Sequence, residues 1–100
     1  MTELEQLRRK IDEIDQELLN LISKRIEIAK KLGELKKSRG LPVADYQREE
    51  QVVARSLRLA DDLGLDKELT SLMLRALIGI CRKAQSRLKV AFLGPRGSFS

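Results

Sequence analysis

Two cations stand out among the apolar residues of the N-terminal part of the chain. Arg25 occupies a heptad position at which Leu18 and Leu32 precede and follow it. Lys36 comes eleven residues later, which is three helical turns, so it points within about 20° of Arg25 at a distance of about 16 Å. A guanidinium in an apolar seam is costly unless it meets an anion or a buried acid, or reaches solvent. The spacing is therefore compatible with two side chains that bracket a small anion and with an arginine paired inside the protein.

Further polar residues occur where they could join these cations. Asp45, Arg48 and Glu49 cluster at the predicted start of a helix, where ordinary capping explains Asp45 but not Glu49, which begins a buried stripe. Cys81 and Gln85 are four residues apart at the edge of an apolar helix face. The amide of Gln85 is either a satisfied core group or a donor to an oxygen atom of a ligand.

The composition excludes several kinds of chemistry. The 100 residues contain no histidine and one cysteine, which excludes an intrachain disulfide, a cysteine zinc site and any catalysis by imidazole. Aromatic residues make up 3% of the chain, too few for a base-stacking surface, so we expect no nucleic-acid partner. No signal peptide and no long apolar run is present, and we expect a cytoplasmic protein without membrane contact.

The elements that would position these residues form an all-α pattern of one long helix and two shorter ones. Thr2-x-x-Glu5 is a capping-box sequence, and apolar residues then repeat with a 4-3 spacing to about Ser38. A helix of about 36 residues is therefore expected, with its end at Gly40. Helices of about 17 and 22 residues follow, and their expected boundaries are Asp45 and Gly64 for the second, and Asp66 and Leu88 for the third.

The apolar residues that repeat with 4-3 spacing from Leu4 to Leu35 form a long apolar seam. This seam requires more covering surface than two short helices provide. A sustained 4-3 pattern is typical of helices that pack along another long helix. Since only a second copy of the chain supplies one, we expect an intertwined homodimer. Arg8 lies about 25 Å from Arg25 along the same helix, so it can reach a pocket at Arg25 only from the partner subunit.

The C-terminal residues differ from the helical body. Val90 to Leu93 is a short apolar run followed by Gly94-Pro95, which predicts a β-strand. A single strand has nothing to pair with in an all-helical body. We therefore expect residues 1–88 to form one domain and residues 89–100 to be a linker and the first strand of a second domain.

The ordered motifs resemble one known family. These are L-R-x-x-I-D-x-I-D from Leu7, Arg25, G-x-x-K from Gly33, P-V-x-D-x-x-R-E from Pro42, and Gln85. Together they resemble the all-helical chorismate mutase domain over residues 4–88. Residues 90–100, V-A-F-L-G-P-R-G-S-F-S, resemble the start of the prephenate dehydratase domain that follows the mutase domain in bifunctional proteins.

This resemblance implies roles for the residues that match the family's motifs. Arg25, and Arg8 of the partner subunit, would bind the two carboxylates of chorismate, for which a planar guanidinium is suited. Lys36 and Gln85 would donate to the ether oxygen. The activity implied is the rearrangement of chorismate to prephenate in phenylalanine and tyrosine biosynthesis, with no cofactor and no metal.

The other matching positions lie at the hydroxyl end of the substrate. Asp45 and Glu49 would hold the ring hydroxyl, with Arg48 beside them. Cys81 departs from the family, in which serine is frequent at this position, and a thiol is a poor hydrogen-bond donor. A contact from Cys81 to a substrate carboxylate would therefore be weak or made by the backbone.

Two other functions remain open at this point. An isochorismate-pyruvate lyase has the same helical scaffold and similar cations, although the dehydratase-like tail favours the mutase. A non-enzymatic helical dimer would not explain Arg25 in the apolar seam.

Overall fold

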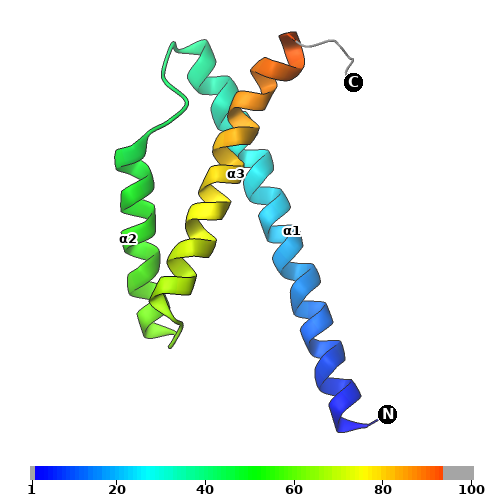
Figure 1. The fold of residues 1–100 in the computed structure, drawn as a ribbon. Coiled ribbons are helices and arrows are strands. Elements are labelled where there is room, and N and C mark those ends of the chain that lie inside the picture. The colour runs from blue at the N-terminus through cyan, green and yellow to red at the C-terminus, as the bar shows by residue number, and fades with distance from the viewer. Residues whose placement is uncertain (1, 94–100) are drawn as a thin grey trace.

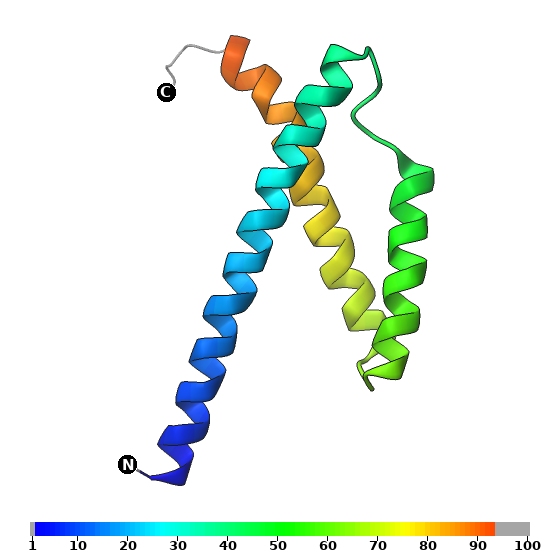
Figure 2. The ribbon, with the colours of Figure 1, turned by 180° about the vertical axis from the view of Figure 1, so that it is seen from behind.

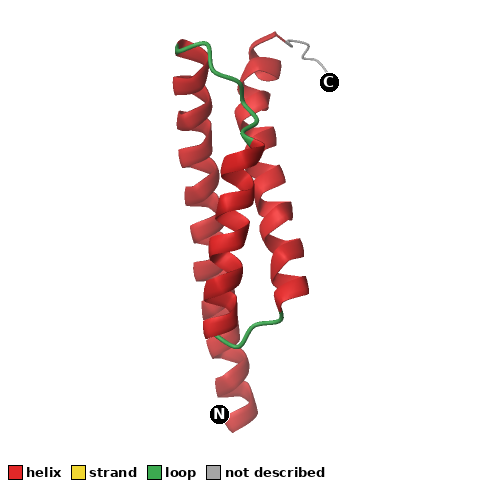
Figure 3. Ribbon diagram, turned by 90° about the vertical axis from the view of Figure 1, so that its left-hand side faces the viewer, coloured by secondary structure: helices red, strands yellow, loops and turns green. Residues whose placement is uncertain are grey.

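Three helices make up the structure, a computed structural model that describes residues 2–93 (Figure 1). They are α1 (Glu3–Ser38), α2 (Tyr46–Asp62) and α3 (Lys67–Leu93), with 36, 17 and 27 residues. Two loops connect them, and no strand occurs among the described residues (Figure 3). The prediction of an all-α chain with one long and two shorter helices is confirmed.

Local signals set the helix starts. Thr2 and Glu5 form a complete capping box, in which the Thr2 hydroxyl accepts from the Glu5 N–H and the Glu5 carboxylate accepts from the Thr2 N–H. The hydrogen bonds from Thr2 lower the pKa of Glu5. Asp45 caps α2 by accepting from the Arg48 N–H at 3.1 Å, and Asp66 accepts from the Leu69 N–H at 2.9 Å at the start of α3.

Two glycines end the first two helices. Gly40 and Gly64 have φ of 68° and 72°, and they follow the last residues of α1 and α2. The N–H groups of Leu41 and Leu65 then donate back to Lys36 and Ala60, each at 2.8 Å, as in a Schellman motif. Glycine favours this left-handed conformation because it has no Cβ.

Helix α3 packs against both other helices, whereas the backbones of α1 and α2 do not come into contact within residues 2–93. Figures 1 and 2 show α1 crossing α3 near the C-terminal end of α1. At this crossing a Cβ added to Gly33 would lie 2.9 Å from the Cβ of Gln85. The two helices approach so closely because residue 33 has no side chain.

The residues whose burial the structure describes, 2–85, bury little apolar surface within the single chain. Its buried apolar side chains are mostly small, namely Ala29, Val53, Ala60, Ile78, Cys81 and Ala84. The N-terminal half of α1 extends away from α2 and α3 (Figures 1 and 2). Ten leucines and isoleucines of α1 remain 44–65% exposed, which is far more apolar exposure than a stable monomer normally has. The unsatisfied seam that the sequence predicts is therefore present.

Val90–Leu93, for which the sequence predicts a strand, are the last residues of α3 in the structure. A continued helix satisfies the backbone groups of these residues within the same segment. Residues 94–100 lie outside the described residues, and the assignment of residues 89–100 to a linker and the first strand of a second domain stays a prediction. Within the described part of the chain, no helix combines the length and the apolar character that crossing a bilayer requires.

The close crossing leads to a prediction for Gly33→Ala. The new Cβ would overlap Gln85, and overpacking of this kind destabilises by about 1–3 kcal/mol. Gly79→Ala is the matched control, because open space surrounds its Cβ position in the chain and alanine favours a helix interior by about 0.5–1 kcal/mol. Thermal unfolding at equal protein concentration should give a lower Tm for Gly33→Ala than for Gly79→Ala. Equal Tm values for the two variants would contradict the close approach.

Candidate active site

A pocket of about 320 Å³ lies between the C-terminal half of α1, the start of α2 and the middle of α3. Seven of the eight residues predicted to form the site line it: Arg25, Lys36, Asp45, Arg48, Glu49, Cys81 and Gln85. Aliphatic side chains of α1, α2 and α3 complete its wall. Small-molecule sites are typically concave and mostly apolar, with a few placed polar groups.

Arg25 is partly buried at one side of the pocket and contacts α3. Its Nη1 donates to Sγ of Cys81 at 2.9 Å, and Cys81 is only 4% exposed. The thiol therefore serves as a weak acceptor that orients the guanidinium. This contact uses one of the five N–H donors of Arg25, so the others can bind an anion.

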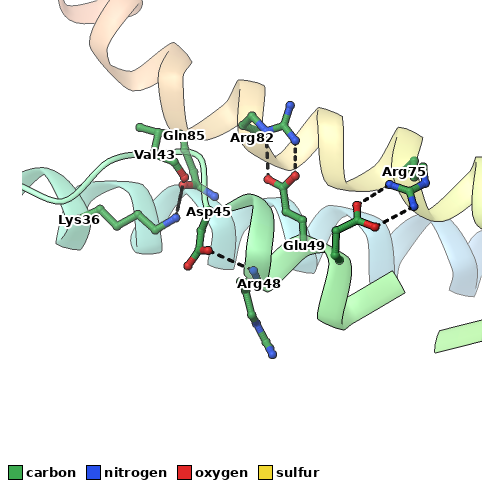
Figure 4. Close-up of polar contacts among 9 residues, drawn as sticks. Lys36, Val43, Asp45, Arg48, Glu49, Arg75, Arg82 and Gln85 are labelled. Carbon is green, nitrogen blue, oxygen red and sulfur yellow. Dashed lines mark hydrogen bonds and ion pairs between the residues drawn. The ribbon is translucent and has the colours of Figure 1, made fainter. Parts of the chain in front are cut away.

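Lys36 and Gln85 meet at the helix crossing. Nζ of Lys36 donates to Oε1 of Gln85 at 3.2 Å and to the carbonyl oxygen of Val43 at 2.7 Å (Figure 4). Because an ammonium group can only donate, it fixes which end of the Gln85 amide faces it. The NH₂ group of Gln85 is then left as a donor. An ammonium and an amide donor side by side are suited to an oxygen atom that gains negative charge.

Glu49 faces α3 across the pocket and pairs with a residue that the sequence analysis missed. Both carboxylate oxygens of Glu49 accept from Arg82, with Nε to Oε2 at 3.1 Å and Nη2 to Oε1 as the second bond (Figure 4). The Arg82 guanidinium also lies over the ring of Tyr46, 5.0 Å from its centroid. Hydrogen bonding to Glu49 raises the pKa of Arg82.

A signal for Arg82 is present in the sequence. Ile78, Arg82 and Gln85 have the spacing i, i+4, i+7, which places them on one face of a helix. All three line the pocket.

Asp45 and Arg48 line the same pocket at the start of α2, and both are exposed. One oxygen of the Asp45 carboxylate serves as the cap of α2. The Arg48 guanidinium points away from Lys36, Gln85 and Glu49 in Figure 4.

Arg8 is the one predicted site residue that does not line the pocket. It lies on the exposed N-terminal half of α1, about 25 Å along the helix from Arg25. Within one chain the two arginines do not come together, and a contribution of Arg8 to a site on a partner stays a prediction.

The charges around the pocket favour an anion. Four cations line it, against two carboxylates, one of which is already paired with Arg82. The chain contains no histidine, and among residues 2–93 no group of three potential ligands could hold a metal ion. The arrangement is suited to binding a small polyanion and stabilising charge on an oxygen atom through fixed donors.

Comparison with known proteins identifies relatives along most of the chain. The model of the family described as chorismate mutase type II matches residues 7–86. A bifunctional chorismate mutase/prephenate dehydratase from Aquifex aeolicus is 35% identical over 103 residues, and the match covers 100% of this chain and 28% of the relative. A chorismate mutase from Methanocaldococcus jannaschii is 35% identical over 75 residues, covering 75% of this chain and 76% of the relative.

A solved structure has the same fold. It is that of a conserved hypothetical protein from Pyrococcus furiosus, with 33% identity and a TM-score of 0.66 over 85% of this chain and 97% of that one. The chain thus spans about a quarter of the length of the bifunctional relative and matches the greater part of the other two proteins.

Proposed function

The chain belongs to the type II chorismate mutase family, and we propose that it rearranges chorismate to prephenate. The observation that carries the proposal is the meeting of Lys36 and Gln85, 3.2 Å apart, in a pocket that also contains Arg25. The relatives named as chorismate mutases support the choice of substrate.

The reaction is an intramolecular [3,3] rearrangement, in which the ether C–O bond breaks as a C–C bond forms. It requires no nucleophile, no proton transfer and no redox step, so a pocket without histidine is sufficient. The residues contribute by holding the extended dianion in its compact reactive conformer. They also stabilise the negative charge that builds on the ether oxygen as its bond breaks.

Lys36 and Gln85 are the donors that we assign to the ether oxygen. Val43 and the close crossing at Gly33 hold them in place before the substrate binds, so little reorganisation is needed during the reaction. Arg25, oriented by Cys81, would bind one substrate carboxylate bidentately. Asp45, Arg48 and Glu49 line the same pocket from the start of α2, and we assign them to the ring hydroxyl.

We further propose that the active protein is a homodimer in which Arg8 of the partner subunit binds the second carboxylate. Two observations support this. Large apolar residues of α1 are exposed from Leu4 to Leu35, and Arg8 lies on the part of α1 that extends away from the other helices. A second α1 packed along this face would cover the seam and bring a new arginine near the pocket.

The assigned ether-oxygen donors predict large losses of activity. Lys36→Ala and Gln85→Ala should each lower kcat/KM for chorismate by a factor of about 10²–10³, the usual effect of removing one preorganised donor. Lys31→Ala, an exposed lysine of α1 outside the pocket, is the control and should stay close to wild type. Chorismate disappearance measures the rate, and circular dichroism checks the fold. A folded variant within about tenfold of wild type would remove that residue from the assignment.

The exposed seam predicts the oligomeric state. Sedimentation equilibrium should give about twice the chain mass of 11.4 kDa. Leu18→Glu, which places a charge in the seam, should shift the protein toward monomers and lower its activity. An active monomer would contradict both the dimer and the shared site.

The separation of the two arginines predicts complementation between inactive variants. Arg8→Ala and Arg25→Ala should each be inactive, because each substitution removes from every site one of the two arginines that bind the substrate carboxylates. In a mixed dimer one site carries both defects and the other is intact, so complete subunit exchange should restore about a quarter of wild-type activity. Exchange can be followed with differently tagged chains. Exchange without recovery would show that Arg8 does not act across the dimer.

A further inference from the structure

Two arginine–glutamate pairs join α2 to α3, and they lie in different surroundings. Glu50 pairs with Arg75 through two hydrogen bonds of 2.8 and 3.2 Å, and Glu49 pairs with Arg82 in the same two-bonded form (Figure 4). In the first pair the side chain of Arg75 is 51% exposed and that of Glu50 is 63% exposed. In the second pair the side chain of Arg82 is 36% exposed and that of Glu49 is 19% exposed. Only the second pair lines the pocket.

An exposed pair of this kind contributes little beyond tethering two helices. Arg75 lowers the pKa of Glu50 through its hydrogen bond, but both groups remain open to water. The Arg82–Glu49 pair lies where a ligand would bind. Its position suggests a function beyond the tether.

The geometry of the pair fixes Glu49 in place. Both of its oxygens accept from the rigid fork of Arg82, which leaves the carboxylate little freedom to rotate. The Tyr46 ring contacts the guanidinium and restrains Arg82 in turn. A carboxylate oxygen has two lone pairs, so each oxygen of Glu49 can still accept one more hydrogen bond.

The pair also places a positive charge beside Glu49. A dianionic substrate next to an unpaired carboxylate would be repelled by it. The guanidinium of Arg82, in direct contact with Glu49, compensates that repulsion.

We propose that Arg82 is a positioning residue for this pocket: it holds Glu49 in one orientation, so that the carboxylate accepts a hydrogen bond from the ring hydroxyl of the substrate. This inference rests on the proposed function and adds to it a residue of α3 that acts only through Glu49. Because the hydroxyl takes no part in the bond changes of the rearrangement, the contact stabilises ground state and transition state alike.

The test is a double-mutant cycle with Arg82→Ala, Glu49→Gln and the double variant, in the chorismate assay. Arg82→Ala should lower kcat/KM by about 10–100-fold, mainly through KM, as expected when a charge-assisted contact of uniform binding is lost. In the Glu49→Gln background, Arg82→Ala should lower kcat/KM by less than about threefold, because the residue through which Arg82 acts has already lost its charge. Arg82→Lys, which keeps the charge without the fork, should recover part of the loss.

Arg75→Ala and Glu50→Gln are the matched controls, because they remove the equivalent tether outside the pocket. Both should keep wild-type kcat and KM. If Arg82→Ala does not fold, Arg82→Lys and Arg82→Gln provide the same comparison with Glu49→Gln.

Three outcomes would overturn the inference while the wild type stays active. The first is a wild-type KM in Arg82→Ala. The second is a loss of kcat/KM on Arg82→Ala that is as large in the Glu49→Gln background as in the wild type. The third is a loss of kcat/KM in Arg75→Ala equal to that in Arg82→Ala. A folded, dimeric wild-type protein without mutase activity would instead overturn the proposed function, and this inference with it.

Discussion

The close crossing of α1 and α3 at Gly33 is the contact on which the rest of the structure depends. Gln85 lies against the backbone at Gly33, where even a methyl group would overlap it. That approach brings Lys36 within hydrogen-bond distance of Gln85 and sets the rotation of α1 at which Arg25 meets Cys81. A wider crossing would separate both pairs and open the pocket, so packing density at one glycine controls the polar geometry around it.

Helix α1 serves two different surfaces along its length. Its C-terminal half packs on α3 and supplies Arg25 and Lys36 to the pocket, whereas its N-terminal half has an exposed apolar face. The small buried core of the single chain follows from this division, because most of the large apolar side chains of α1 have no partner within the chain. If a second chain covers the apolar seam, α1 takes part both in the contact between chains and in the pocket. Association of the chains is then coupled to assembly of the site.

The pocket retains more positive than negative charge because its cations are only partly compensated. Arg82 is paired with Glu49, but Arg25 contacts a neutral thiol and Lys36 contacts a carbonyl and an amide oxygen. Neutral acceptors orient these cations without neutralising them. A dianion entering the pocket therefore meets donors that are already in place, which is the arrangement that favours electrostatic stabilisation of charge on an oxygen atom.

The sequence by itself determined the helices, their starts and most of their ends, because the groups involved lie within a turn of one another. Thr2 with Glu5, Asp45, Asp66, Gly40 and Gly64 act on neighbouring backbone groups, and no distant contact is needed to place them. Seven of the eight expected site residues also lie in one pocket, a result that came from the resemblance of ordered motifs and not from helical spacing alone. The tertiary structure alone decided which partners they meet. Arg82 and Glu49 are 33 residues apart, and their pairing depends on how α2 and α3 are rotated against each other. Val90–Leu93, an apolar run that predicts a strand in the sequence, continue α3 in the structure, because a helix satisfies these backbone groups within the segment itself.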